Sequence, residues 1–245
     1  MVCFAANYYE TAAGGSPVGV NPVGVLSAVG AWNKDGSRVG DFIREEDIGR
    51  WFRAVRRLEN RTASDFLTFL VLTGCRSMEA SLLTWDKVLF ASRMIRLNAS
   101  DTKSSRHHEF PISEYLTKVL MDRAEWSESR FVFEGKSSKH SNGAFTNPAK
   151  SCASIVKTTG IQFTPHDLRR SFARIVGHPE CGGDELAIKA LINHATSDVT
   201  QTHYYKTHPE RMRPTTEAVT NFILRRARAL GFDSRPASRP KLSNY

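Results

Sequence analysis

The sequence lacks any run of about 18 apolar residues, the length that a membrane-spanning helix needs. Its first residues, Met1 to Tyr9, have no positively charged start and no long apolar stretch, so they do not resemble a secretory signal. From these two absences we expect a cytoplasmic protein with no membrane partner.

Cysteine is scarce and scattered. The four cysteines, Cys3, Cys75, Cys152 and Cys181, form no C-x-x-C pair, so we expect reduced thiols. His178 lies close to Cys181 in GHPEC, but a structural zinc site needs about four ligands. We interpret this stretch as a surface loop. A glycine-rich phosphate loop is also missing, so the sequence predicts neither a metal nor a cofactor.

Negative charge is in deficit. The 245 residues include 34 Lys+Arg against 25 Asp+Glu, which gives a formal net charge of +9. A basic surface attracts polyanions, and nucleic acid is the commonest of them. Composition alone does not distinguish a DNA-binding protein from other basic proteins, so motifs must decide whether this chain binds DNA.

The middle of the chain carries the helical patterns. Residues 11–40 are rich in Gly, Pro, Ser and Val, and residues 231–245 in Pro, Ser and Arg, as is typical of linkers and tails. Apolar residues at helical spacing predict an amphipathic helix over 43–59. The segment from Ser64 to Gly74 is apolar on nearly every side, which predicts a buried helix capped by Ser64 and ended by Gly74. We expect a short helix from Ser77 toward Trp85.

Residues 87–112 change character. The short apolar pieces VLF, MIRL and EFPI predict three antiparallel strands. Residues 130–133 predict a brief extended segment. Further helices are expected from Ser113 to about Trp126, over 147–159, from Thr164 and Pro165 with Asp167 in a capping position, from Asp184 toward Asn193, from Ser197 or Asp198, and over 210–230. The predicted fold is therefore mainly α with a small antiparallel three-stranded sheet.

Two segments in the first half of the chain carry cations where a structural interpretation expects none. Arg76, in TGCRSMEASLLTW, lies between a buried helix and the next one, where a guanidinium needs an anionic partner. That partner is either Glu79 or a ligand phosphate, which a guanidinium can bind through two hydrogen bonds. Lys103, in DTKSSRHHEF, lies near a hairpin tip, where a lysine is usually just solvated.

Two further segments follow. In TPHDLRRSFA, His166 and Arg169 share one face at a helix start, where the helix dipole favours an anion. LINHATSDVTQTHYYK contains His194, Tyr204 and Tyr205. Tyrosines in a helix are more often core than catalyst, and His194 could be the hydrogen-bond partner that a buried tyrosine needs.

In their order and chemical type, these segments resemble the tyrosine recombinase (phage integrase) family, from about Arg44 to about Leu230. The resemblance implies the catalytic-domain fold of that family. It divides the chain into a linker with the remnant of a core-binding domain (1–40), a catalytic domain (41–230) and a flexible tail (231–245). The implied active site consists of Arg76, Lys103, His166, Arg169, His194 and Tyr204.

The family's chemistry is site-specific DNA recombination through a 3′-phosphotyrosyl intermediate, with no metal. The resemblance implies that Tyr204 attacks the phosphodiester while Arg76, Arg169 and His194 bind its oxygens. It also implies that His166 receives the tyrosine proton, that Lys103 protonates the leaving 5′-oxygen, and that Glu79 and Asp167 orient their neighbours. The implied partners are double-stranded DNA and three further copies of the chain, with a monomer expected when DNA is absent.

Two features depart from the family pattern. Only about 40 residues precede the catalytic segment, so the chain resembles a fragment or an unusually short member. Tyr204 lies ten residues after His194, whereas many members place the tyrosine nine after, where this chain has His203. The segment VTQTHY resembles the subset with histidine just before the nucleophile. This favours Tyr204 and leaves Tyr205 as the alternative.

Other interpretations stay open from the sequence. A type IB-like topoisomerase shares the tyrosyl chemistry, and a DNA-binding module that has lost activity would share the fold. The helix over 210–230 also has two interpretations: its apolar face packs on its own domain, or it docks onto a neighbouring subunit in a DNA-bound tetramer.

Overall fold

The computed structural model describes residues 42–135, 142–193 and 209–233, all of which lie in one compact unit, Gly40–Tyr245. The α-helices of these ranges are α3 (Glu45–Arg56), α4 (Arg61–Thr73), α5 (Ser77–Ser81), α6 (Glu114–Ala124), α7 (Ala149–Thr159), α8 (Pro165–Val176), α9 (Glu185–Leu191) and α11 (Arg213–Arg228). Short 3-10 helices are η1 (Trp85–Lys87), η2 (Ala99–Asp101) and η3 (Pro209–Met212). None of the helices within the described ranges has the length and apolarity needed to cross a bilayer.

The sheet is small and antiparallel, as predicted. Strands β1 (Val88–Leu89), β2 (Met94–Leu97) and β3 (His108–Pro111) pair in the order β1-β2-β3. Ile95 in the middle strand pairs with Val88 on one side and Phe110 on the other, and all three side chains are buried. The prediction of a mainly α fold with a three-stranded antiparallel sheet is confirmed.

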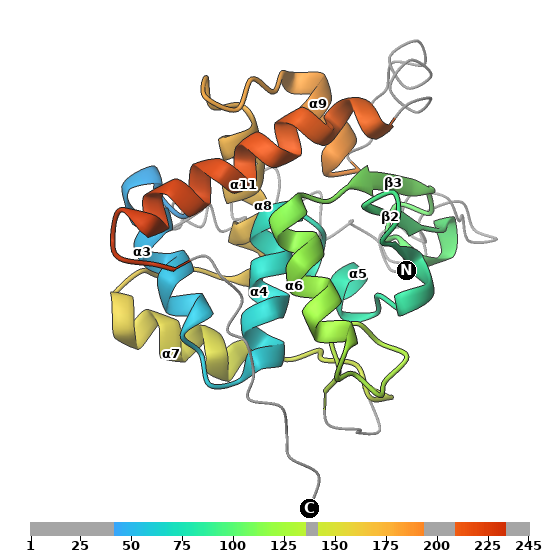
Figure 1. The fold of residues 1–245 in the computed structure, drawn as a ribbon, viewed down its shortest axis with the longest axis horizontal. Coiled ribbons are helices and arrows are strands. Elements are labelled where there is room, and N and C mark those ends of the chain that lie inside the picture. Colours follow the sequence, from blue (N-terminus) through green and yellow to red (C-terminus); the bar gives the residue numbers. More distant parts are fainter. Residues whose placement is uncertain (1–41, 136–141, 194–208, 234–245) are drawn as a thin grey trace, which may run out of the picture. The chain divides into compact units, whose positions relative to one another are not determined.

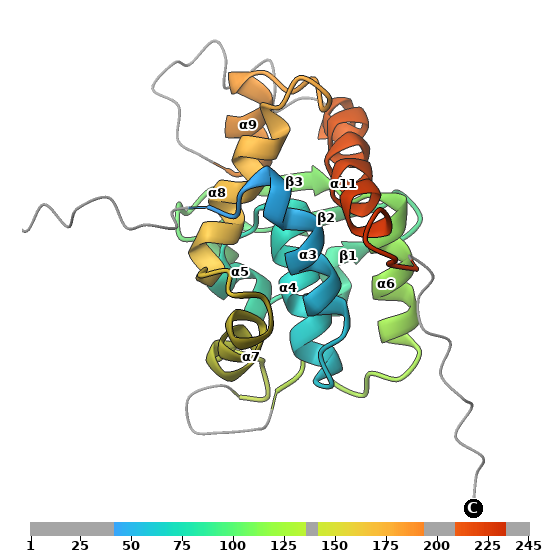
Figure 2. The ribbon, with the colours of Figure 1, turned by 90° about the vertical axis from the view of Figure 1, so that its left-hand side faces the viewer.

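Helix α4 is the buried centre of the unit. Its side chains are buried from Ala63 to Thr73, and α3, α5, α6 and α8 all pack against it. In Figure 2, α5 and the start of α8 lie on one side of α4 while α6 lies on the other. Gly74 ends α4 in the left-handed conformation, with φ 64°, as predicted.

The predicted start of α4 was wrong. The helix begins at Arg61, and Asn60 rather than Ser64 caps it by accepting a hydrogen bond from the Ala63 backbone N–H at 3.0 Å. Ser64 instead lies buried inside the helix, where its hydroxyl accepts from Arg56 at 3.2 Å. The cap was missed because the first turn, RTAS, is polar and hides the helical pattern.

The remaining elements follow the sequence closely. Ser113, Thr164 and Asp184 cap α6, α8 and α9 with side-chain hydrogen bonds, and Gly160 ends α7 with φ 73°. The extended segment expected at 130–133 is reduced to a single bridge between Thr84 and Phe131. The linker over 11–40, the helix expected from Ser197 or Asp198, and residues 234–245 of the tail lie outside the described residues.

Helix α11 packs on its own unit. Figure 1 shows it lying across α3, and its face formed by Val219, Phe222, Ile223 and Ala227 is buried, whereas Leu230 beyond its end is exposed. Gly49 in α3 allows this close approach, because a Cβ atom there would lie 2.6 Å from the Arg226 backbone. Of the two interpretations of this helix, the structure therefore shows packing on its own unit.

Candidate active site

Four of the six predicted site residues line one pocket of about 540 Å³. Arg76 comes from the junction of α4 and α5, Lys103 from the β2–β3 hairpin, and His166 and Arg169 from the first turns of α8. The other two, His194 and Tyr204, lie outside the described residues. The fold thus brings together residues that are far apart in sequence, and their catalytic roles remain predictions.

Glu79 is a buried carboxylate that lines this pocket. It is 6% exposed, and its Oε1 accepts from Arg76 Nη1 at 3.0 Å and from the Lys103 backbone N–H at 3.2 Å. The Cys75 thiol lies 3.8 Å from Oε2, and burial, followed by the charge of Glu79, raises the pKa of this thiol well above its usual range. Both sequence alternatives for Arg76 remain compatible, because one guanidinium nitrogen binds Glu79 and the side chain is still 26% exposed at the pocket.

Arg169 is held by backbone carbonyls. Its Nη1 donates to Gly74 O at 2.7 Å and its Nη2 donates to Ile192 O. Gly74 cannot be replaced easily, because a Cβ atom there would lie 2.4 Å from the ring of Phe172 in α8. The tight junction after α4 therefore fixes the carbonyl that orients Arg169.

Lys103 lies in a turn whose backbone is held by hydrogen bonds. The ammonium group of its side chain is not held in this way. Thr102 closes the turn by donating to Arg106 O at 2.7 Å and accepting from the Arg106 backbone N–H at 3.0 Å. Ser105 takes a left-handed φ of 50° in the same turn. Within the described part of the chain the Lys103 ammonium has no hydrogen-bond partner, so it can reach a ligand in the pocket.

His166 is exposed in the first turn of α8 and makes no hydrogen bond to any described residue. Its neighbour Asp167 does not orient it, contrary to the role the resemblance implied. The Asp167 carboxylate instead accepts from the Thr164 backbone N–H at 2.8 Å and from its hydroxyl at 2.7 Å, and lies 3.6 Å from Arg170. Asp167 therefore stabilises the helix start that presents His166.

The pocket favours an anion. Burial and then the nearby charge of Arg76 lower the pKa of Arg169, so the two guanidiniums repel each other in a poorly solvated place. With Lys103 they bring three positive charges against the carboxylate of Glu79, while the pocket's other carboxylate, Asp101, is paired with Lys87 at 2.7 Å. The first turn of α8 adds the positive end of a helix dipole. A phosphate group placed among these cations would relieve their repulsion.

Three residues next to the pocket escaped the sequence analysis. The buried His108 of β3 bonds to Ala190 O of α9 at 3.1 Å, and Asn193 Nδ2 donates to Ser104 Oγ at 3.1 Å. The only sequence signals were a histidine in an apolar strand and an asparagine after a helix. Neither signal identifies a partner more than 80 residues away, because such contacts depend on the tertiary fold.

The phage integrase family model matches residues 41–211, which is more than half of the chain. The chain belongs to the phage integrase family. It is 27% identical over 194 residues to the prophage integrase IntF of Escherichia coli strain K12, covering 78% of this chain and 41% of IntF. The prophage integrase IntZ of the same strain is 27% identical over 117 residues, covering 47% of this chain and 29% of IntZ. This integrase-family chain spans less than half the length of these curated relatives.

Solved structures share the fold. The integrase from mycobacterium phage Brujita gives a TM-score of 0.56 at 15% identity, over 83% of this chain and 75% of that one. The XerH site-specific recombinase bound to difH substrate, in a pre-cleavage complex, gives a TM-score of 0.55 at 13% identity, over 83% of this chain and 61% of that one. The resemblance derived from the sequence motifs is therefore confirmed for the family and for the fold.

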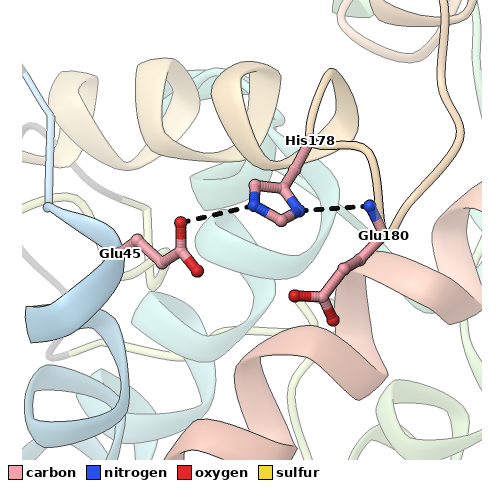
Figure 3. Close-up of side chains that lie close together, drawn as sticks. All are labelled: Glu45, His178 and Glu180. Atoms are coloured by element: carbon pink, nitrogen blue, oxygen red, sulfur yellow. Dashed lines mark hydrogen bonds and ion pairs between the residues drawn. The ribbon is translucent and has the colours of Figure 1, made fainter.

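A second cluster of titratable groups lies away from the pocket of this integrase-family chain (Figure 3). His178 Nε2 is 3.3 Å from the Glu45 carboxylate, and its Nδ1 accepts from the Glu180 backbone N–H at 3.2 Å. The ligand atoms of these three residues lie within 4.8 Å of one another, a spacing that could suit a metal ion. However, Arg226 binds both carboxylates and Arg225 binds that of Glu180, so two guanidiniums already balance the two negative charges.

This cluster is better described as a group of ion pairs that joins the start of α3, the α8–α9 loop and α11. The Arg226 guanidinium also lies over the Phe222 ring, 3.3 Å from its centre. The prediction of a surface loop at GHPEC was only partly right, because Cys181 is 5% exposed and belongs to the core. Cys75, Cys152 and Cys181 are free thiols, as expected.

Proposed function

We propose that this chain carries the active site of a tyrosine-type site-specific recombinase, which cuts and rejoins DNA through a 3′-phosphotyrosyl bond. The observation that carries the proposal is the meeting of Arg76, Lys103, His166 and Arg169 at one positively charged pocket. Family membership supports it. XerH, which shares the fold, is a site-specific recombinase bound to difH substrate, and this supports double-stranded DNA as the partner.

The proposed reaction begins with attack of the Tyr204 phenol oxygen on the phosphorus of a DNA phosphodiester. The bond from phosphorus to the 5′-oxygen breaks, and a phosphotyrosyl bond replaces it, so that the energy of the broken bond is kept for rejoining. A phenol has an ordinary pKa of about 10 and must lose its proton, for which His166 is the acceptor. Lys103 gives a proton to the departing 5′-oxygen. Rejoining is the same sequence in reverse.

Charge stabilisation falls to the arginines. The phosphate gains negative charge as it becomes five-coordinate, and Arg76 and Arg169 are held beside the pocket by Glu79 and by two backbone carbonyls. Guanidiniums fixed in this way stabilise the transition state without having to reorganise. Because they occupy the charge-neutralising role, we propose that cleavage needs neither a divalent metal nor a nucleotide.

The test is to trap the covalent adduct. Nicked duplexes tiled across the DNA that flanks the coding sequence are incubated with this chain in the presence of EDTA, and protein bonded to DNA is separated by denaturing electrophoresis. We expect an adduct that Tyr204→Phe abolishes and Tyr205→Phe retains in part. An adduct that depends on added magnesium would contradict the metal-free mechanism. Equal adduct from Tyr204→Phe and the parent chain would move the nucleophile to Tyr205.

We further propose that four copies assemble on paired DNA sites and that the chain is monomeric without DNA. Strand exchange needs four cleavages that are coordinated, whereas the described residues provide one cationic pocket per chain of the kind described above. Light scattering of the chain with and without the trapping duplex measures the assembly directly.

A further inference from the structure

The last turn of α9 is tied to the β2–β3 hairpin by two side-chain contacts. His108, at the first position of β3, lies 3.1 Å through its Nε2 from Ala190 O. Asn193, just after α9, donates through its Nδ2 to Ser104 Oγ at 3.1 Å. Ser104 is the residue after Lys103, so both contacts act on the hairpin that presents the proposed general acid.

The chemistry of the His108 contact fixes the state of the ring. A carbonyl oxygen can only accept, so Nε2 carries the proton and donates it to Ala190 O. Nδ1 is then an unprotonated nitrogen, and it is buried without a partner among the described residues. Burial, reinforced by the charges of Arg169 and Arg76, lowers the pKa of His108 to about 4, so the ring is neutral at physiological pH.

A buried imidazole with one unpaired nitrogen is a costly way to fill space. An apolar ring of similar size would pack beside Phe110, whose ring centre lies 4.6 Å from that of His108, without leaving a polar atom unsatisfied. What the histidine adds is the N–H that reaches α9. The free-energy cost of the unsatisfied Nδ1 is therefore explained by a requirement for the link between β3 and α9 at this site.

Lys103 shows why the link would matter. Its ammonium has no partner among the described residues, so its position depends on the backbone of the turn. On one side, Glu79 of α5 accepts from the Lys103 backbone N–H at 3.2 Å. On the other side, within the described ranges, Ser104 and His108 link the hairpin to the end of α9. A displacement of about 1 Å at a reacting group can lower a rate by about 100-fold.

We propose that the two ties between the hairpin and the end of α9, His108 to Ala190 and Ser104 to Asn193, are positioning contacts that hold Lys103 where it can protonate the leaving 5′-oxygen. The inference rests on the proposed recombinase function and on the role given there to Lys103. His108 and Ser104 act through Lys103 and do not themselves touch the DNA.

The variants separate the hydrogen bond from the packing. His108→Phe keeps a ring and removes the N–H donor, whereas His108→Gln places an amide N–H near the original Nε2. Ser104→Ala removes the second tie at a half-buried position and serves as an independent test if His108→Phe does not fold. On the duplex that traps the parent chain, we expect His108→Phe and Ser104→Ala to form the adduct about 10- to 100-fold more slowly at saturating protein. His108→Gln should stay within about threefold of the parent rate, with DNA affinity unchanged in all three.

A second substrate identifies the step that has failed. In a duplex with a 5′-bridging phosphorothioate, the leaving group is a thiolate, which departs without a proton because thiols have ordinary pKa values of about 8.5. If the ties position Lys103, then His108→Phe, Ser104→Ala and Lys103→Ala should all regain the parent rate on this substrate to within about threefold.

Each outcome decides the inference. Slow cleavage of both substrates by His108→Phe and Ser104→Ala would mean a general structural defect and would overturn it, as would a parent-like rate for both variants on the ordinary substrate. Rescue of Lys103→Ala without rescue of these two variants would leave the general acid in place and overturn only the positioning role. If the parent chain forms no adduct with either substrate, the proposed function itself fails, and the inference fails with it.

Discussion

Glu79 is shared by three groups of the pocket: the Arg76 guanidinium, the Lys103 backbone N–H and, at longer range, the Cys75 thiol. Removing the Glu79 carboxylate would leave the Arg76 guanidinium and the Lys103 backbone N–H without this acceptor. We expect Glu79→Ala to lower the free energy of unfolding by about 2–4 kcal/mol, and Glu79→Gln by about half as much, because the amide oxygen can still accept hydrogen bonds but carries no negative charge. Urea unfolding measures both variants, and parent-like stability of Glu79→Ala would contradict this arrangement.

The neutral state of His108 makes a prediction about pH. Its pKa is lowered to about 4 in the folded chain, against an ordinary value of about 6.5 when unfolded. Between these two pH values His108 is protonated in the unfolded chain but not in the folded chain. The free energy of unfolding therefore falls as the pH is lowered from about 6.5 toward about 4. The full effect is about 3 kcal/mol.

Urea unfolding at pH 7 and pH 4.5 measures this loss, with His108→Gln as the control that cannot titrate. The charged groups facing His108 are Arg169 from α8, Arg76 from the start of α5, and its neighbour His107. The arginines keep their charge across this range, and His107 is present in both proteins. An equal loss of stability in the parent and in His108→Gln would show that another group is responsible.

Motif order pointed to the residues around the pocket, because Arg76, Lys103, His166 and Arg169 each lie in a short segment of recognisable chemical type. It did not show what holds them. Arg169 is oriented by the backbone carbonyls of Gly74 and Ile192. Every residue has such a carbonyl, so the sequence does not show which ones bind a side chain. Asp167 illustrates the opposite error, since its proximity to His166 in sequence suggested an orienting role that the capping of α8 already uses.

Among the elements, α11 gives the sharpest prediction. A chain ending after Pro214 would lose Val219, Phe222 and Ile223, all at most 1% exposed, and would uncover α3. Removing even one large core side chain costs about 2–5 kcal/mol, and a whole domain is stable by only about 5–15 kcal/mol. We expect the truncated chain to unfold, as seen by loss of helical circular dichroism. A folded truncated chain that cleaves DNA but fails in strand exchange would instead restore the docking interpretation.

Element boundaries could be predicted wherever a local signal marked them. Thr164 with Pro165 and Asp167 forms the capping box of α8, and Gly160 ends α7 in the left-handed region. The extended segment expected at 130–133 is present but short, because only residues 130–132 pair with residues 83–85. Val132 accepts, through its carbonyl, from the fully buried Arg123, which also binds Asp65 of α4 at 3.2 Å. Such a buried ion pair between distant helices has no periodic pattern in the sequence.

For the molecule as a whole, the net charge of +9 matters through its distribution. A groove of about 710 Å³ between α3 and α7 is lined by cations that include Arg50, Arg57 and Lys150. Figure 2 shows α7 and α5 on the side of the unit opposite α6. Under the proposed function, the cations on the side of the candidate pocket would contact the DNA backbone, and such contacts supply most of the affinity but no sequence selection.

The whole-molecule prediction is that this chain alone binds DNA weakly, with a dissociation constant in the micromolar range at physiological salt, as expected for about three or four phosphate contacts. Each contact adds about 0.9 to the slope of log affinity against log salt, so Lys150→Ala should reduce that slope by about one. Lys118→Ala is the matched control, because Lys118 lies on α6 and is paired with Glu114 at 2.6 Å. Fluorescence anisotropy of a labelled duplex at several salt concentrations measures all three proteins. Two results would contradict the prediction that one face of the protein binds DNA through few phosphate contacts. The first is nanomolar, site-specific binding by the parent chain, and the second is an equal loss of slope in both variants.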